Sequence, residues 1–419
     1  MTPINNTNDT QTPSLEEKLK YPIPFADHSL ECPVLYDRVR QECPVVQVQM
    51  PFGGDAFLLT RHEDVVKAWS DPTCGIIQVS DGDVPRTEVG QTVGSGGEGE
   101  SLFSVSDARH NKTRRLITQA FTVKAANTLV PRVVALTNAL VDTMEQAGPP
   151  ADLFEDYAIH TPMAVVCEML GVPAKDELQF RKWGNALMST TISAQEFQAE
   201  QMQMGAYLFP LIERERQQPG NTVLGTLVKA FEQGDEVITQ QELLSLAGGL
   251  IAAGFETVST TFTNSAFLLL PRPELIAQLR ERLDNPERMA TAIEEILRIT
   301  PIGWARPRIA RGDITLSGTT IHPGSVLLLD VLAANSDESV FPAAREINFD
   351  REVNPMVTFG RGIHACLGQQ VARMELRVLW TTLLRRLPNI RLAVAPEEVP
   401  WRSNETATFG PAHLPVIWK

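Results

Sequence analysis

Residues 359–368 read Phe-Gly-Arg-Gly-Ile-His-Ala-Cys-Leu-Gly and place one cysteine on a loop that leads into a helical pattern. Its three glycines allow positive φ angles and a close approach of the backbone to a flat partner. The first amide groups of the following helix have no intrahelical partner and are directed back at the sulfur of Cys366. Amide donors and the positive end of a helix favour a thiolate, so we expect Cys366 to hold a metal. Haem iron accepts such a ligand, and the thiolate then favours O–O cleavage of bound dioxygen.

Two other interpretations of this cysteine remain to be weighed. A structural zinc site would need four ligands, whereas His364 and Cys366 offer two, and the sequence contains no Cys-x-x-Cys. A lone buried cysteine beside a turn is the commonest fate of a free thiol. Against both, the spacing Phe-Gly-x-Gly-x-His-x-Cys-x-Gly resembles the haem-binding loop of the cytochrome P-450 family, with every signature position filled. The resemblance implies that Phe359, Gly360, His364, Cys366 and Gly368 bind haem b, with Cys366 as the axial ligand of the iron.

A second group of residues with possible chemistry, Glu256-Thr257, lies in a long apolar helical pattern over 240–270. Burying a carboxylate is costly unless something uses it. Thr257 can donate to dioxygen while Glu256 relays protons from solvent, and Gly254 removes a side chain where a ligand would approach. The alternative is a glycine-kinked core helix in which the threonine bonds to its own backbone. The order Ala253-Gly254-x-Glu256-Thr257 resembles the family's oxygen-activation motif, which implies contact of Ala253 and Gly254 with the cofactor.

Cationic side chains at two further places could hold carboxylates. His110 and Arg114 are four residues apart on one face of a helix predicted over 110–121, although such pairs are also common on solvated faces. In the family, a His-x-x-x-Arg at this place binds the haem propionates together with His364. An arginine before a later hairpin does the same, and the Arg-x-Ala-x-x-Asp context favours Arg308 over Arg306.

The resemblance also implies structural and substrate-contacting residues. Glu295 and Arg298, three apart on a helix predicted over 287–300, match the family's Glu-x-x-Arg, which steadies the core near the cysteine loop. Residues 73–107 form a long glycine-rich stretch that is either a lid over the substrate or a surface insertion. The residues expected to line the substrate pocket are Phe103, Leu250, Ala253, Thr257, Ile302, Trp304 and Thr408.

Composition excludes several classes of protein. The 419 residues carry a formal net charge of −14, which argues against a nucleic-acid partner and against an acidic membrane surface. Five scattered cysteines suggest a reducing compartment. The polar segment 1–11 lacks the pattern of a signal peptide or anchor, and the apolar stretch 243–270 contains Glu256 and Asn264. We therefore expect a cytoplasmic protein that does not span a membrane.

The fold class follows from the pattern of elements. Helical spacing over 124–146, 155–170, 174–190, 194–218 and 367–386 is separated by short breaks, and strands are expected at 45–50, 56–60, 390–394 and 414–418. Length alone suggests two or three domains. The resemblance instead implies one large, mainly α domain with a minor β region over 21–419, after a flexible N-terminal tail at 1–20.

The predicted function is a haem-thiolate mono-oxygenase that inserts one oxygen atom of O2 into a small, largely apolar organic substrate, with hydroxylation as the leading reaction. A ferredoxin or flavodoxin with its reductase would supply electrons and dock on a basic cluster. This cluster comprises Lys112, Arg115, Arg361, Arg373 and Arg377. Peroxide-driven oxygenation, coupling or desaturation, and a non-catalytic haem sensor remain open, and the sequence does not identify the substrate.

Overall fold

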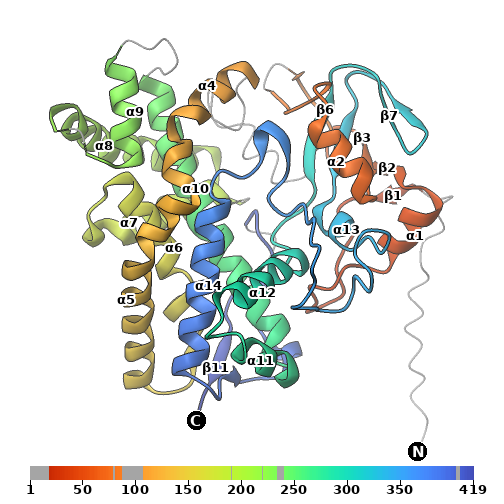
Figure 1. Cartoon of the computed structure of the whole chain (residues 1–419). Coiled ribbons are helices and arrows are strands. Elements are labelled where there is room, and N and C mark those ends of the chain that lie inside the picture. The colour runs from red at the N-terminus through yellow and green to blue at the C-terminus, as the bar shows by residue number, and fades with distance from the viewer. Residues whose placement is uncertain are drawn as a thin grey trace, which may run out of the picture.

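The structure is a computed structural model that describes residues 18–78, 81–86, 107–189, 191–218, 220–233, 240–402 and 406–419. Helices fill one side of the molecule, and most strands lie on the other with three short helices (Figure 1). The helices are α1 (Leu35–Glu42), α2 (His62–Ser70), α4 (Asp107–Ile117), α5 (Val123–Ala147), α6 (His160–Leu170), α7 (Glu177–Met188), α8 (Ala194–Gln217), α9 (Val223–Glu232), α10 (Gln240–Leu269), α11 (Pro273–Arg280), α12 (Pro286–Ile299), α13 (Val331–Asn335) and α14 (Gln369–Arg386). The mainly α class with a minor β region is confirmed.

The strands form one larger and two small sheets. They are β1 (Leu19–Lys20), β2 (Val45–Gln49), β3 (Asp55–Leu59), β4 (Cys74–Gly75), β5 (Ala151–Asp152), β6 (Arg306–Ala310), β7 (Ile314–Leu316), β8 (Thr319–Ile321), β9 (Val326–Leu329), β10 (Arg391–Leu392) and β11 (Pro415–Ile417). Their orders are β1-β2-β3-β9-β6-β4, β10-β11-β5 and β7-β8.

The strands predicted at 45–50 and 56–60 are confirmed and form a hairpin, which β1 extends on one side and β9, β6 and β4 on the other. β2 and β3 pair antiparallel in the register Val45↔Leu59, and Gly53 and Gly54 of the turn have φ of 76° and 99°. Strand β1 pairs with β2, and its Leu19 is buried. The last two residues of the predicted tail 1–20 therefore belong to the sheet.

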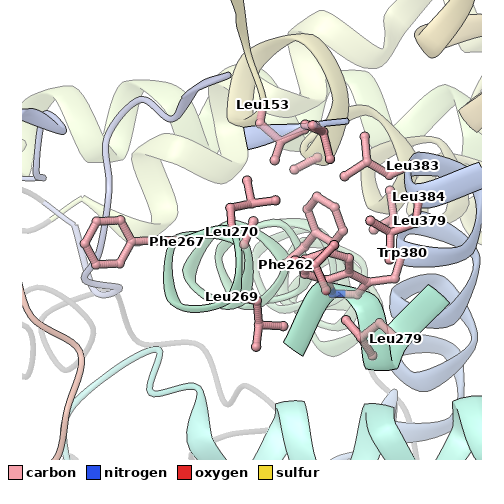
Figure 2. Close-up of a cluster of buried hydrophobic side chains, with 14 of the residues drawn as sticks. Leu153, Phe262, Phe267, Leu269, Leu270, Leu279, Leu379, Trp380, Leu383 and Leu384 are labelled. Carbon is pink, nitrogen blue, oxygen red and sulfur yellow. The ribbon is translucent and has the colours of Figure 1, made fainter. Parts of the chain in front are cut away.

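Helix α10 is the centre of the hydrophobic core. Its 30 residues span roughly 45 Å, and α6, α7 and α14 pack around it. Figure 2 shows Phe262 of α10 beside Leu379 and Trp380 of α14. The Phe262 and Trp380 rings lie 5.1 Å apart, and the indole nitrogen of Trp380 donates to Ser265 at 3.2 Å. Glu242–Leu269 is apolar and long enough to cross a membrane, but 56% of its most apolar window is buried inside the protein, as in a core helix.

A buried ion pair joins α12 to the chain that approaches the cysteine loop. Arg298 donates from Nε and Nη2 to the two carboxylate oxygens of Glu295 at 2.8 and 2.7 Å, and both side chains are buried. The guanidinium also donates to the carbonyls of Asn335 and Ala344, each at 2.8 Å. Glu295 in turn accepts from Arg351 at 3.1 Å. The predicted pairing of Glu295 with Arg298 is therefore confirmed, and it fixes the segment 335–351 against α12.

Candidate active site

The cysteine loop crosses the C-terminal end of α2, and two of its glycines are needed there. Gly360 and Gly362 have φ of 65° and 69°, and a Cβ on Gly362 would lie 2.9 Å from the carbonyl oxygen of Trp69. Gly368 instead has φ −80° and is the N-cap residue of α14. The expectation that all three glycines adopt positive φ is wrong for Gly368, because the chain already turns into the helix there. A Cβ at Gly368 would meet no described atom within 4 Å, so the space next to this glycine is open.

The Cys366 side chain is exposed, yet protein atoms surround it closely enough to desolvate it. The sulfur is thus accessible to solvent although protein atoms crowd around it. Desolvation raises the pKa of the thiol, against the backbone N–H of Gly368 and the guanidinium groups of Arg114, Arg306 and Arg373. The donors favour the thiolate as expected, but burial outweighs them, so the expectation of a thiolate is wrong for the polypeptide alone. A bound metal ion would provide the missing stabilisation, because coordination deprotonates a thiol.

Three elements bring positive charge to this sulfur: α4, β6 and α14. Arg114 projects from α4 and Arg306 from β6. Desolvation lowers the pKa of both guanidinium groups, and the charge of the Cys366 sulfur opposes this lowering. The rings of His110 on α4 and His364 in the loop lie 4.2 Å apart between centroids. The structure thus brings His110 and Arg114 of one predicted motif together with His364 and Cys366 of another.

The two arginines of β6 differ in their surroundings. They lie two positions apart and so share one face of the strand. The charge of Arg306 acts on Cys366, whereas that of Arg308 acts on Cys74, and Arg308 Nη1 donates to the neighbouring Pro307 carbonyl at 2.8 Å. Arg306, which the sequence pattern favoured less than Arg308, is therefore the arginine whose charge acts on the sulfur. Binding of a propionate by Arg308 stays a prediction.

Helix α10 presents an accessible face in the middle of its buried length. Ala253 is exposed, and Leu250 and Thr257, three and four positions away, are partly exposed on the same face. The Thr257 hydroxyl donates to the Ala253 carbonyl at 2.8 Å, as in the backbone-bonded alternative. Gly254 points elsewhere: a Cβ there would lie 2.3 Å from Cγ2 of Val166 on α6. The suggestion that Gly254 clears space for a ligand is therefore wrong, because the glycine allows two helices to pack closely.

The Glu256 carboxylate is buried and held on one side. Its Oε1 accepts from the Thr408 hydroxyl at 2.7 Å and lies 3.4 Å from Arg402 Nη1. Its Oε2 is buried without a hydrogen-bond partner in the described part of the chain. Burial raises the pKa of Glu256, while the Thr408 hydrogen bond and the charge of Arg402 oppose the rise. Sequence reasoning missed Arg402, which lies 146 positions away and in no motif.

The residues predicted to line the substrate pocket fall into different environments. Thr408 is buried and bonded to Glu256, so its hydroxyl is engaged in that network. Trp304 is half-buried in an aromatic cluster with Tyr21, Phe25 and Phe409, at centroid distances of 6.5, 6.1 and 5.0 Å. Ile302 is half-buried, as Leu250 is, and Phe103 lies outside the described residues.

Comparison with known proteins decides the family. The family model described as Cytochrome P450 matches residues 196–417. Mycinamicin IV hydroxylase/epoxidase of Micromonospora griseorubida is 40% identical over 94% of this chain and 98% of that protein. The chain belongs to the cytochrome P450 family. Nocardicin C N-oxygenase of Nocardia uniformis subsp. tsuyamanensis is 37% identical to this P450 over 94% of the chain and 98% of that protein. Among solved structures, the LnmA cytochrome P450 hydroxylase from the leinamycin biosynthetic pathway of Streptomyces atroolivaceus superposes with a TM-score of 0.86 at 34% identity, over 96% of this chain and 100% of that one.

Membership makes this P450 a mono-oxygenase, that is, an oxidoreductase whose cofactor is haem b. The residues present fit that cofactor. Haem carries two propionates, and neither Arg114 nor Arg306 forms an ion pair with any carboxylate in the described ranges. Two desolvated cations beside an accessible cysteine sulfur are therefore available for the acidic groups of a bound haem.

Proposed function

We propose that this P450 inserts one oxygen atom of O2 into a small, largely apolar organic substrate, with hydroxylation as the leading reaction. The observation that supports this proposal most directly is the Cys366 sulfur, which is accessible and on which the guanidinium charges of Arg114, Arg306 and Arg373 act. Relatives whose names give their reactions support this proposal. They include a hydroxylase/epoxidase, an N-oxygenase and a vitamin D(3) 25-hydroxylase.

In this proposal Cys366 binds the haem iron, and His110, Arg114, His364 and Arg306 or Arg308 hold the propionates. Phe359, Gly360 and Gly368 bring the loop backbone close to the cofactor, and Ala253 offers a small side chain on α10. A thiolate-bound haem supplies the electron density that favours O–O cleavage. Arg373 supports the loop indirectly: it pairs with Glu294 at 2.6 Å, and its guanidinium lies 4.5 Å from the Phe359 ring centroid.

Proton handling falls to the acid and the alcohol of α10. The Thr257 hydroxyl is accessible and can exchange its bond to the Ala253 carbonyl for one to a ligand or water. Glu256 lies one residue earlier and has a raised pKa, so its carboxyl group holds a proton more readily than an exposed glutamate. A carboxyl group with a pKa closer to neutrality is suited to donating and recovering protons.

The experiment that tests this function is spectroscopic. Purified protein, reduced and exposed to carbon monoxide, should show the far red-displaced Soret band of sulfur-bound haem, and folded protein without that band would refute the assignment of Cys366. Thr257→Ala should retain this band but divert electrons into hydrogen peroxide once a substrate is bound. Fully coupled turnover by that variant would contradict the role of Thr257.

We further propose that the protein is cytoplasmic and takes electrons from a separate ferredoxin or flavodoxin with its reductase. Lys112 and Arg115 are exposed on α4. Arg115 also lines an open hollow of about 410 Å3 between α4 and the cysteine loop, where Ile363 is 41% exposed. Positive charge around an accessible apolar side chain fits a small acidic protein.

A further inference from the structure

Arg402 reaches the acid of α10 from the C-terminal part of the chain. Its side chain is 10% exposed, and the guanidinium lies 4.7 Å from the ring centroid of Phe154. Nη1 lies 3.4 Å from Glu256 Oε1 and donates to the hydroxyls of Thr260 and Thr408 at 3.0 and 2.6 Å. One guanidinium thus contacts the carboxylate and also the hydroxyl group that donates to it.

Backbone contacts hold the chain on either side of these two partners of Glu256. The backbone N–H of Arg402 donates to the carbonyl of Gly410 at 2.9 Å. Asn264 of α10 donates to the Phe409 carbonyl at 3.0 Å, and a Cβ on Gly410 would lie 2.0 Å from the Asn264 side-chain oxygen. Phe409 and Gly410 are therefore packed directly against the helix that carries the acid.

The two oxygens of the Glu256 carboxylate are consequently different. Oε1 is occupied by Thr408 and faces Arg402, whereas Oε2 is buried and accepts no hydrogen bond from any described group. A buried carboxylate oxygen without a donor is costly, and protonation at that atom relieves the cost. The proton of the acid therefore binds at Oε2.

We propose that Arg402 is a positioning residue for proton delivery, which holds Oε1 together with Thr408 so that Oε2 takes up and releases the proton. This inference rests on the proposed role of Glu256. No described hydroxyl contacts Oε2, so the acceptor in this proposal is a water that reaches the atom when the carboxyl group turns about its anchored Oε1. In each cycle the Oε2–H bond breaks as the proton passes to that water, and the carboxylate regains a proton that originates in solvent. Arg402 stays protonated throughout, and no electrons are transferred.

The charges around Glu256 and Arg402 determine the direction in which loss of Arg402 shifts the pKa of Glu256. Among the described groups, Arg402 is the charged residue that acts on Glu256, and its effect is to lower the pKa of the carboxyl against the larger effect of burial. Glu155 acts on Arg402 from the other side and is itself paired with Arg181 at 2.7 Å. Loss of the Arg402 charge therefore raises the pKa of Glu256 further, so that the acid deprotonates at higher pH.

The first measurement is a pH titration of the Glu256 carboxyl by infrared difference spectroscopy of the haem-loaded protein, with Glu256→Gln identifying the band. Arg402→Gln should move the midpoint upward by about one pH unit, because an opposite charge at this distance lowers a carboxyl pKa by about that much or more. Arg402→Lys retains the charge and should titrate close to the unmodified protein. Arg216→Gln, which removes a guanidinium from ion pairs with Glu213 of α8 and Glu232 of α9, should leave the midpoint unchanged. An unchanged midpoint in folded Arg402→Gln would overturn the inference.

The second measurement separates this inference from the function on which it rests. Dioxygen consumption, driven by a surrogate ferredoxin and its reductase without added substrate, is recorded against pH. The rate should fall as Glu256 deprotonates, Glu256→Gln should abolish that pH dependence, and Arg402→Gln should move it upward by the same amount as the infrared midpoint. If Glu256→Gln keeps the dependence, the proposed role of Glu256 fails. If Glu256→Gln abolishes the pH dependence but Arg402→Gln does not move it, the role of Glu256 stands and only the positioning role of Arg402 fails.

Discussion

Gly254→Ala tests why α10 carries a glycine beside its acid and alcohol. The added methyl group would lie 2.3 Å from Cγ2 of Val166, which is buried and β-branched and therefore nearly fixed in its helical rotamer. Overpacking of a core costs about 1–3 kcal/mol, whereas alanine in place of glycine in a helix interior contributes about 1 kcal/mol of stability. Because the contact is far inside van der Waals distance, we expect the free energy of unfolding to fall by about 1–2 kcal/mol.

A double-mutant cycle isolates this contact. In a Val166→Ala background the clash is gone, so Gly254→Ala should stabilise by about 1 kcal/mol, which gives a coupling of about 2–3 kcal/mol. Urea unfolding of the haem-loaded proteins, followed by circular dichroism, measures both steps. The control is Gly205→Ala on α8, where a Cβ would meet no described atom within 4 Å and stabilisation of about 0.5–1 kcal/mol is expected. The reasoning is refuted if Gly254→Ala loses haem at unchanged stability, or if Val166→Ala gives no relief.

The other predictions concern the buried ion pair and the basic cluster. Arg298→Ala should lower the free energy of unfolding by about 3–5 kcal/mol, because it removes the bidentate partner of buried Glu295 and leaves two buried carbonyls without that donor. Arg38→Ala, in an exposed pair with Glu42, should cost less than about 1 kcal/mol. Burial alone would raise the pKa of Glu295, but Arg298 reverses this and the net shift is downward. The stability from the pair is therefore present above the ordinary pKa of 4.5 and lost as the pH falls below it, and acid titrations of Arg298→Ala should show a smaller loss. Charge reversal at Arg115 and Arg377 should slow reduction by an acidic ferredoxin at low salt, and an unchanged stopped-flow rate would exclude docking there.

Sequence reasoning succeeded where the determining interactions are local. The cysteine loop, α10 and the β2–β3 hairpin were predictable because turn residues and periodicity act over a few positions. It failed at Gly254, whose purpose depends on Val166, 88 positions earlier on another helix. It also failed at Arg402, because no local pattern indicates that a residue 146 positions from Glu256 will approach its carboxylate.

The place of β11 in its sheet determines how late in synthesis the fold can be completed. β11 is the middle strand, paired with β10 on one side and with β5 on the other, more than 260 residues earlier in the chain. Cys366 is synthesised well before this strand, whereas Arg402 and Thr408 lie in the segment just ahead of it. At about 5–20 residues per second, the interval lasts a few seconds. A nascent chain therefore displays its cysteine loop while Glu256 still lacks the side chains that will hold it.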